Sequence, residues 1–248
     1  MKKLCVLLAV FLLPLFVSAE APKFFELRTY HTHPGKLDAL HARFSDHTIP
    51  LFTKHGMTNV AYWTPKDQPE TLIYLMGYPS QEAREASWKA FMNDPDWKTA
   101  YAASTADGKL VAKVESVYLA PTDYSPALKI DEQDPARLFE LRIYTTNEGK
   151  LDALNARFHD HTVGLFDKHG VHNLAYFNPT RKKDGANNKL VYFVWHKDEA
   201  ARKQAFGAFG KDPAWKTARD ASEANGKLMI KGGVSSIFLE PTDYSPMK

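Results

Sequence analysis

One segment of this sequence is written twice in tandem, and the repeat limits the possible folds more than any other feature. Residues 25–30, Phe-Glu-Leu-Arg-Thr-Tyr, recur at 139–144 as Phe-Glu-Leu-Arg-Ile-Tyr. Both copies close with the run Pro-Thr-Asp-Tyr-Ser-Pro, at 121–126 and 241–246. A period this long indicates duplicated domains rather than a solenoid of short units. We place the domains at 23–126 and 137–246, joined by a linker at 127–136.

Within each copy the apolar pattern changes from a period of two to a period of 3.6 in a fixed order. In the first copy, a strand at 24–30 precedes a helix that begins at Gly35 and ends at Gly56. Two strands, a helix, a short helix and a last strand follow. The apolar stripe expected on the first helix consists of Leu37, Leu40, Phe44, His47 and Leu51.

The order strand, helix, strand, strand, helix, strand is that of a ferredoxin-like unit in the α+β class. Such a unit covers only one face of its antiparallel sheet with helices. The other face has to meet water or another protein surface. Since the chain carries two units and a linker long enough to let them meet, we expect the two uncovered faces to pack on each other as a closed pseudo-dimer.

Residues 1–19 have the pattern of a secretory signal peptide. Two lysines precede an apolar stretch from Leu4 to Val17, and small residues precede a cleavage site after Ala19. The stretch is too short for a spanning helix, so we expect no membrane insertion after cleavage. The predicted location is periplasmic or secreted. The one cysteine, Cys5, leaves with the signal, so no disulfide or thiolate site is expected.

The charge balance argues against two classes of partner. The chain has 32 basic and 29 acidic residues, a formal net charge of +3. An excess this small does not favour nucleic acid or an anionic membrane as the partner. His31 and His33 form a His-x-His pair, but Thr145 and Asn147 replace them in the second copy, so no metal site is expected.

Several motifs in the right order resemble the NIPSNAP family. They are the run at 25–30, Pro34-Gly35, the segment 47–56 and Asp94-Pro95-Asp96-Trp97. The resemblance covers both copies and implies a tandem pair of NIPSNAP domains that form an intramolecular dimeric α/β barrel. It implies no established catalytic activity, because members are described mainly as binding or adaptor proteins. The second copy departs from the pattern where Gly164 replaces Pro50 and Phe177 replaces Trp63.

Polar residues alternate with apolar ones along the first strand of each copy. Since neighbouring strand residues face opposite sides of a sheet, three polar residues share one face. We assign the apolar set to the helices, so the polar set is expected in the space between the two sheets. These residues are Glu26, Arg28 and Tyr30, repeated as Glu140, Arg142 and Tyr144. They form either a satisfied ion-pair network or a ligand cavity in which arginine binds a carboxylate.

His47 and His161 occupy positions on the first helix of each copy where an apolar residue is expected. They are either hydrogen-bonded core residues or groups facing a cavity, where a haem ligand is one alternative. No other cofactor is predicted. No phosphate-binding loop, nucleophile elbow or His-Glu-x-x-His run is present.

These observations leave two classes of function. The favoured hypothesis is an exported, non-catalytic module that binds a small molecule or a protein. The alternative is an enzyme of the dimeric α/β-barrel kind, such as a cofactor-poor oxygenase or isomerase, acting in the same cavity. Self-association into a homo-oligomer is compatible with either.

Overall fold

The computed structural model describes residues 21–248, so the predicted signal peptide lies outside the described residues. The first unit consists of β1 (Phe24–Thr32), α1 (Leu37–Arg43), η1 (Phe44–Thr48), α2 (Ile49–Lys54), β2 (Thr58–Pro65), β3 (Thr71–Tyr78), α3 (Gln81–Asn93), α4 (Pro95–Ser104) and β4 (Val111–Pro121). The second consists of β5 (Leu138–Thr146), α5 (Leu151–Arg157), η2 (Phe158–Thr162), α6 (Val163–Lys168), β6 (His172–Pro179), η3 (Lys182–Asp184), β7 (Lys189–His196), α7 (Glu199–Lys211), α8 (Pro213–Ser222) and β8 (Met229–Pro241).

Side-chain caps begin both of the later helices of the first unit. The Ser80 hydroxyl accepts a hydrogen bond from the Ala83 amide at 3.2 Å, which caps α3. The Asp94 carboxylate accepts one from the Asp96 amide at 2.8 Å, and Pro95 takes the first position of α4. Within residues 21–248, no helix is both long and apolar enough to cross a lipid bilayer.

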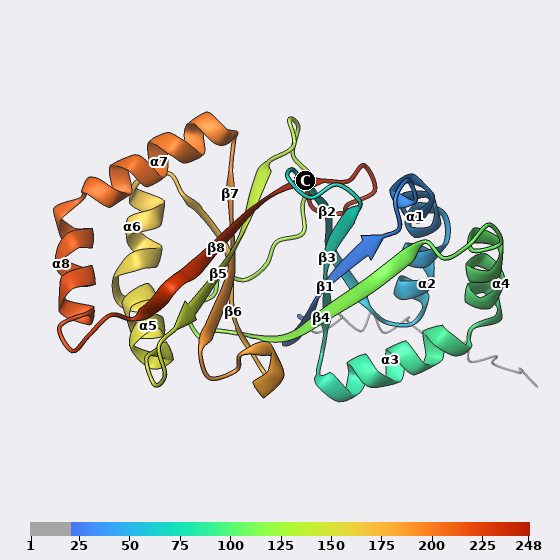
Figure 1. Cartoon of the computed structure of the whole chain (residues 1–248), viewed down its shortest axis with the longest axis horizontal. Coiled ribbons are helices and arrows are strands. Elements are labelled where there is room, and N and C mark those ends of the chain that lie inside the picture. The colour runs from blue at the N-terminus through green and yellow to red at the C-terminus, as the bar shows by residue number, and fades with distance from the viewer. Residues whose placement is uncertain (1–20) are drawn as a thin grey trace, which may run out of the picture.

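The strands of both units close into one antiparallel barrel with the order β1-β3-β2-β8-β5-β7-β6-β4. The two units join at two seams. At one seam Trp63 of β2 pairs with Pro241 of β8, and at the other Leu119 of β4 pairs with Pro179 of β6. Figure 1 shows the strands in the middle of the molecule, with α1 to α4 at one end and α5 to α8 at the other. The predicted intramolecular dimeric α/β barrel is confirmed.

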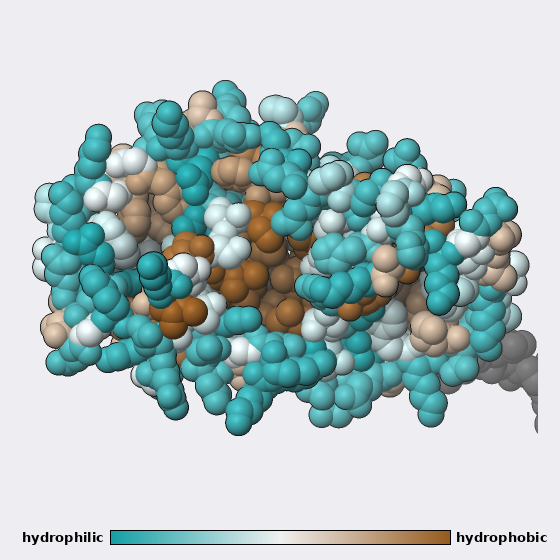
Figure 2. Space-filling model, in the orientation of Figure 1, coloured by the Kyte–Doolittle hydropathy of each residue, from teal (hydrophilic) through white to brown (hydrophobic). Residues whose placement is uncertain are grey.

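Three apolar cores hold this arrangement together. The barrel core is shared, since Phe25 packs on Phe177 at 5.0 Å between ring centroids and Trp63 stacks on Phe193 at 5.3 Å. The other two cores lie between each half of the barrel and its own helices. Figure 2 shows apolar residues gathered in the middle of one face, over the strands, while hydrophilic residues coat the helical ends.

Candidate functional site

The polar residues of β1 and β5 lie on the side of the sheet opposite to the predicted one. Phe25 and Leu27 point into the barrel core, whereas both carboxylate oxygens of Glu26 accept hydrogen bonds from α3. The prediction that the polar set points between the two sheets is therefore wrong for Glu26, Arg28 and Tyr30 and for Glu140, Arg142 and Tyr144. The barrel interior is walled by strands and takes the apolar set, while the helices supply the hydrogen-bond donors that a buried carboxylate needs.

Glu26 is fully buried and saturated with donors. Arg84 donates to both of its oxygens at 2.8 Å, Trp88 donates at 3.1 Å, Ser116 donates at 2.6 Å, and Arg28 forms an ion pair with it. Burial acts to raise the pKa of the carboxyl, but the hydrogen bond from Arg84, the charge of Arg28 and the hydrogen bond from Ser116 outweigh it. The pKa of Glu26 therefore lies below its usual range. Its role is structural, because no acceptor is left for a ligand.

A cavity of about 380 Å³ opens beside this network, between β1 and β4 on one side and the helices of the first unit on the other. Aromatic rings form most of its apolar wall. They are those of Tyr30, Phe44, Phe52, Trp88, Phe91, Trp97 and Tyr101. The volume falls in the range of small-molecule sites, which are mostly apolar with a few polar groups that fix orientation.

Arg28 forms a rigid cationic part of the cavity wall. Its Nε donates to the Tyr74 hydroxyl at 2.9 Å and its Nη2 donates to the Tyr30 hydroxyl at 3.1 Å. The guanidinium carbon lies 4.4 Å from the ring centroid of Trp88, a cation–π contact. Glu26 neutralises the charge of Arg28. Arg28 and Tyr30, which were predicted to line a cavity between the two sheets, line this cavity between sheet and helices instead.

Arg43 is the wall residue that sequence reasoning missed. Only 6% of its surface is exposed, and its Nη1 donates to the Ser104 hydroxyl at 3.3 Å. Its guanidinium lies 5.5 Å from the ring of Trp97 and 5.4 Å from the ring of Tyr101. Among residues 21–248, no carboxylate forms an ion pair with Arg43 and its Nε has no hydrogen-bond partner. Burial lowers the pKa of Arg43.

A π-helical turn positions Arg43. In η1, the amide of Ile49 donates to the carbonyl of Phe44, and the Thr48 hydroxyl donates to the carbonyl of Arg43 at 3.1 Å. Each bond spans five residues, so one extra residue is accommodated in the turn. Arg43 and Thr48 are thereby both buried on the cavity side of the helix. The second unit repeats the turn with Thr162 and Arg157 at the same distance.

His47 and His161 are exposed and do not lie on the buried face of their helices. The prediction that they sit on the apolar stripe is wrong, because the π-turn shifts the stripe by one residue, from His47 to Thr48. The residues that are buried on this face of the helix are Leu40, Phe44, Thr48, Leu51 and Phe52. No histidine lines the cavity within the described chain. Neither histidine fits the role of a haem ligand there.

The second unit contains the same network in a more closed form. Glu140 is fully buried and accepts hydrogen bonds from Arg202 at 2.9 and 3.0 Å and from Ser236 at 2.5 Å. Arg142 pairs with Glu140 and donates to the Tyr144 hydroxyl at 3.0 Å. Burial acts to raise the pKa of Glu140, but these partners, with His196, hold it well below its usual range. Arg142 is itself buried, whereas Arg28 is half-buried.

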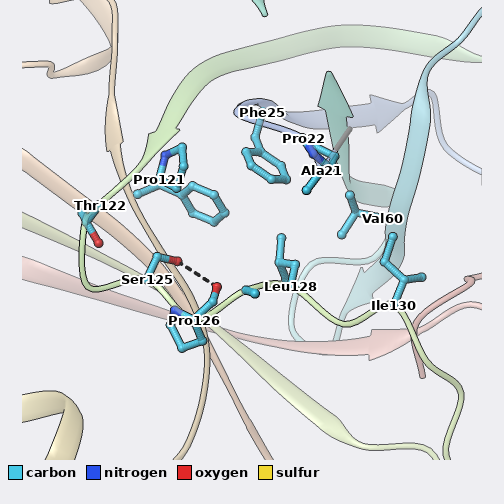
Figure 3. Close-up of a pocket in the computed structure, with 12 residues that line it drawn as sticks. Ala21, Pro22, Phe25, Val60, Pro121, Thr122, Ser125, Pro126, Leu128 and Ile130 are labelled. Atoms are coloured by element: carbon cyan, nitrogen blue, oxygen red, sulfur yellow. Dashed lines mark hydrogen bonds between the residues drawn. The ribbon is translucent and has the colours of Figure 1, made fainter. Parts of the chain in front are cut away.

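Another cavity, of about 270 Å³, lies at one end of the barrel. Figure 3 shows Phe25, Val60 and Leu128 around it, together with the prolines at the start of β1 and the end of β4. Its two hydroxyl groups are already used: that of Ser125 donates to the Pro126 carbonyl and accepts from the Tyr176 amide, and that of Thr122 donates to the Tyr176 carbonyl. No ionisable side chain lines this space among residues 21–248, so it offers no charged group to a ligand.

The fold and the cavity define a class: a tandem dimeric α/β barrel with a ligand-sized space between sheet and helices. A family model described as NIPSNAP matches residues 25–126 and 139–246, so this chain belongs to the NIPSNAP family. The resemblance stated from the sequence is therefore confirmed. A comparison with curated proteins finds no match.

Solved structures resemble the chain in two ways. A candidate monooxygenase from Lactobacillus acidophilus matches with a TM-score of 0.57 at 10% identity, over 90% of this chain and 94% of that one. One from Fusobacterium nucleatum matches with a TM-score of 0.53 at 10% identity, over 90% and 93%. An uncharacterised NIPSNAP domain protein from Burkholderia xenovorans matches with a TM-score of 0.37 at 21% identity, over 42% of this chain and 98% of that one. At these identities the first two show the fold alone.

The cavity provides binding groups rather than proton-transfer groups. Its lining includes the cationic side chains of Arg28, Arg43, Lys109 and Lys113, with no Asp, Glu or His among the described residues. Arginine keeps its charge at any physiological pH, so it orients an anion but is a poor acid or base. Residues 21–248 contain no group of three or more His, Cys, Asp or Glu side chains placed to hold a metal ion.

Proposed function

We propose that this protein binds a small molecule with an apolar body in the cavity of its first unit. The observation that supports the proposal is a space of about 380 Å³, walled by aromatic rings and bordered by the buried Arg43, which has no acidic partner among residues 21–248. Sites of this size and lining enclose most of the surface of a small ligand. A binding role was the hypothesis favoured from the sequence. The proposed site, however, lies between the sheet and the helices rather than between the two sheets.

The test is calorimetric titration with an uncharged planar probe, 2-naphthamide. Ala112 lies on the cavity wall as the second residue of β4, and Ile230 is the second residue of β8, at the matching position of the second unit. We expect about one molecule bound per chain and an affinity at least about tenfold lower in Ala112→Trp, because the indole occupies the space. Ile230→Trp is the matched control and should bind as the unchanged protein does. Equal binding by all three proteins would place the probe elsewhere.

An enzymatic role in the same cavity stays an alternative. Two structural neighbours that match over 90% of the chain are candidate monooxygenases, which is an analogy of fold. The phenol of Tyr30 is one group on the wall that could donate a proton, and Arg28 already donates a hydrogen bond to it. No contact in the described chain favours catalysis over binding.

Export is proposed from residues 1–19 alone. Cleavage after Ala19 predicts a mature chain that begins at Glu20. Mass spectrometry of the protein recovered from the exported fraction measures this directly. A retained Met1 would contradict the proposal.

A further inference from the structure

Arg43 and Arg157 are the matching buried arginines of the two units, and they differ in their ion-pair partners. In the second unit, Arg157 lies 3.8 Å from the carboxylate of Glu223, which also binds Lys227 at 2.6 Å. Glu223 follows the last residue of α8, and Thr105 follows the last residue of α4 in the first unit. The first unit therefore has a threonine at the position where the second unit has this carboxylate.

Two cations of the first unit lack the counterion that the second unit supplies. Of the four cationic side chains on the cavity wall, Arg28 pairs with Glu26 and Lys113 pairs with Glu115. Arg43 and Lys109 form no ion pair within residues 21–248. Lys109 has the position that Lys227 has in the second unit. The wall thus carries a net positive charge that nothing in the described chain neutralises.

A buried, unneutralised guanidinium is costly, and natural sites normally pair it. Trp97 and Tyr101 contribute cation–π contacts, but these do not occupy its free Nε. Arg157 has the same contact with Trp215, at 5.1 Å, and its Nε also lacks a hydrogen-bond partner among residues 21–248, so what separates the two units is the carboxylate of Glu223 beside Arg157. Arg219 replaces Tyr101 in the second unit, but it has its own partner in Asp220 at 2.7 Å.

We infer that the ligand of the first unit carries a carboxylate, which takes at Arg43 the role that Glu223 has at Arg157. This inference rests on the proposed function and narrows it to one chemical class: a small acid with a planar apolar body. The aromatic wall holds the body, while Arg43 and Lys109 hold the carboxylate through charge-assisted hydrogen bonds. In the second unit Glu223 already pairs with Arg157 and Lys227, so we expect one ligand per chain, at the first unit.

The experiment compares 2-naphthoate with its uncharged analogue 2-naphthamide by calorimetric titration of the full chain. Since a hydrogen bond to a charged group contributes more than a neutral one, we expect 2-naphthoate to bind at least about tenfold more tightly. Thr105→Glu installs the carboxylate of the second unit and should abolish this preference while 2-naphthamide still binds. Arg43→Met should abolish it too, with circular dichroism to check the fold.

Glu223→Thr is the matched control, because it alters the other unit: the first-unit site should keep its preference, and any second molecule of 2-naphthoate would be bound at the freed Arg157. Equal affinity of the unchanged protein for both probes overturns the carboxylate inference and leaves the proposed function standing. Binding of neither probe overturns both. A preference that survives in Thr105→Glu also overturns the inference, because it would place the carboxylate away from Arg43.

Discussion

Glu26 and Glu140 show how single buried charges are tolerated in this fold. Each carboxylate is fully buried, and each is matched by two arginines and a serine. Removing one partner of such a network leaves an uncompensated buried charge, which typically costs about 3 to 5 kcal/mol. Glu26 therefore anchors β1 to α3 and fixes Arg28 at the cavity wall.

The pKa of Glu26 sets the direction of a pH effect on stability. Because it is lowered in the folded state, the unfolded chain binds more protons in acid. The stabilisation is present above the ordinary glutamate pKa of about 4.3 and is lost as the pH falls further. We expect urea unfolding to show a free energy of unfolding that drops below about pH 4, with a smaller drop in Glu26→Gln. The same drop in both proteins would contradict this assignment.

Arg43 could have been found in the sequence by one signal. The triplet Ala-Arg-Phe recurs at 42–44 and 156–158, which marks an arginine next to the buried phenylalanine of each copy. Arginine on an amphipathic helix usually reaches water, so residue type alone gives no reason to place it inside. That Arg43 lacks a counterion is seen only in the structure, where Glu223 lies beside Arg157 and no carboxylate of residues 21–248 pairs with Arg43.

At the scale of elements, the π-turn in the first helix decides which side chains of that helix are buried. Strand and helix order and both capping residues were predictable, because they depend on local patterns. A strict 3.6-residue period, however, places His47 on the buried face, whereas the turn buries Thr48. A one-residue insertion within a helix has no reliable local signature, so the buried set after it was not predictable.

The π-turn predicts different effects for two adjacent residues. Thr48→Val removes a buried hydroxyl that donates to the Arg43 carbonyl, so we expect a loss of about 1 kcal/mol in the free energy of unfolding. His47→Ala changes an exposed side chain and should stay within about 0.5 kcal/mol of the unchanged protein. Urea denaturation of both variants provides the measurement. A larger loss of unfolding free energy for His47→Ala than for Thr48→Val would contradict this and support a buried His47, as predicted from the sequence.

At the scale of the whole molecule, neither unit is complete without the other. The barrel core draws on both, and both seams pair a strand of one unit with a strand of the other. The uncovered faces were correctly expected to meet. Which side chains fill that space was predicted wrongly, since alternation along a strand defines two faces without saying which one meets the helices.

The shared core predicts one cooperative unfolding transition and a large effect of Trp63. This side chain is fully buried against Phe139 and Phe193 of the other unit. Trp63→Ala should cost about 3 to 5 kcal/mol and destabilise both units together. Trp63→Phe should cost less, because Phe177 already fills the matching position and the indole N–H has no hydrogen-bond partner within residues 21–248. Two separate transitions by calorimetry and circular dichroism would show that the units unfold independently.

The central claim is that the first unit holds a small carboxylate between its sheet and its helices. A crystal structure of the full chain with 2-naphthoate tests it most directly. The account predicts one bound molecule, with the ring system against Trp88 and Trp97 and the carboxylate on Arg43. A ligand in the cavity at the barrel end, or a carboxylate turned away from Arg43, would contradict it.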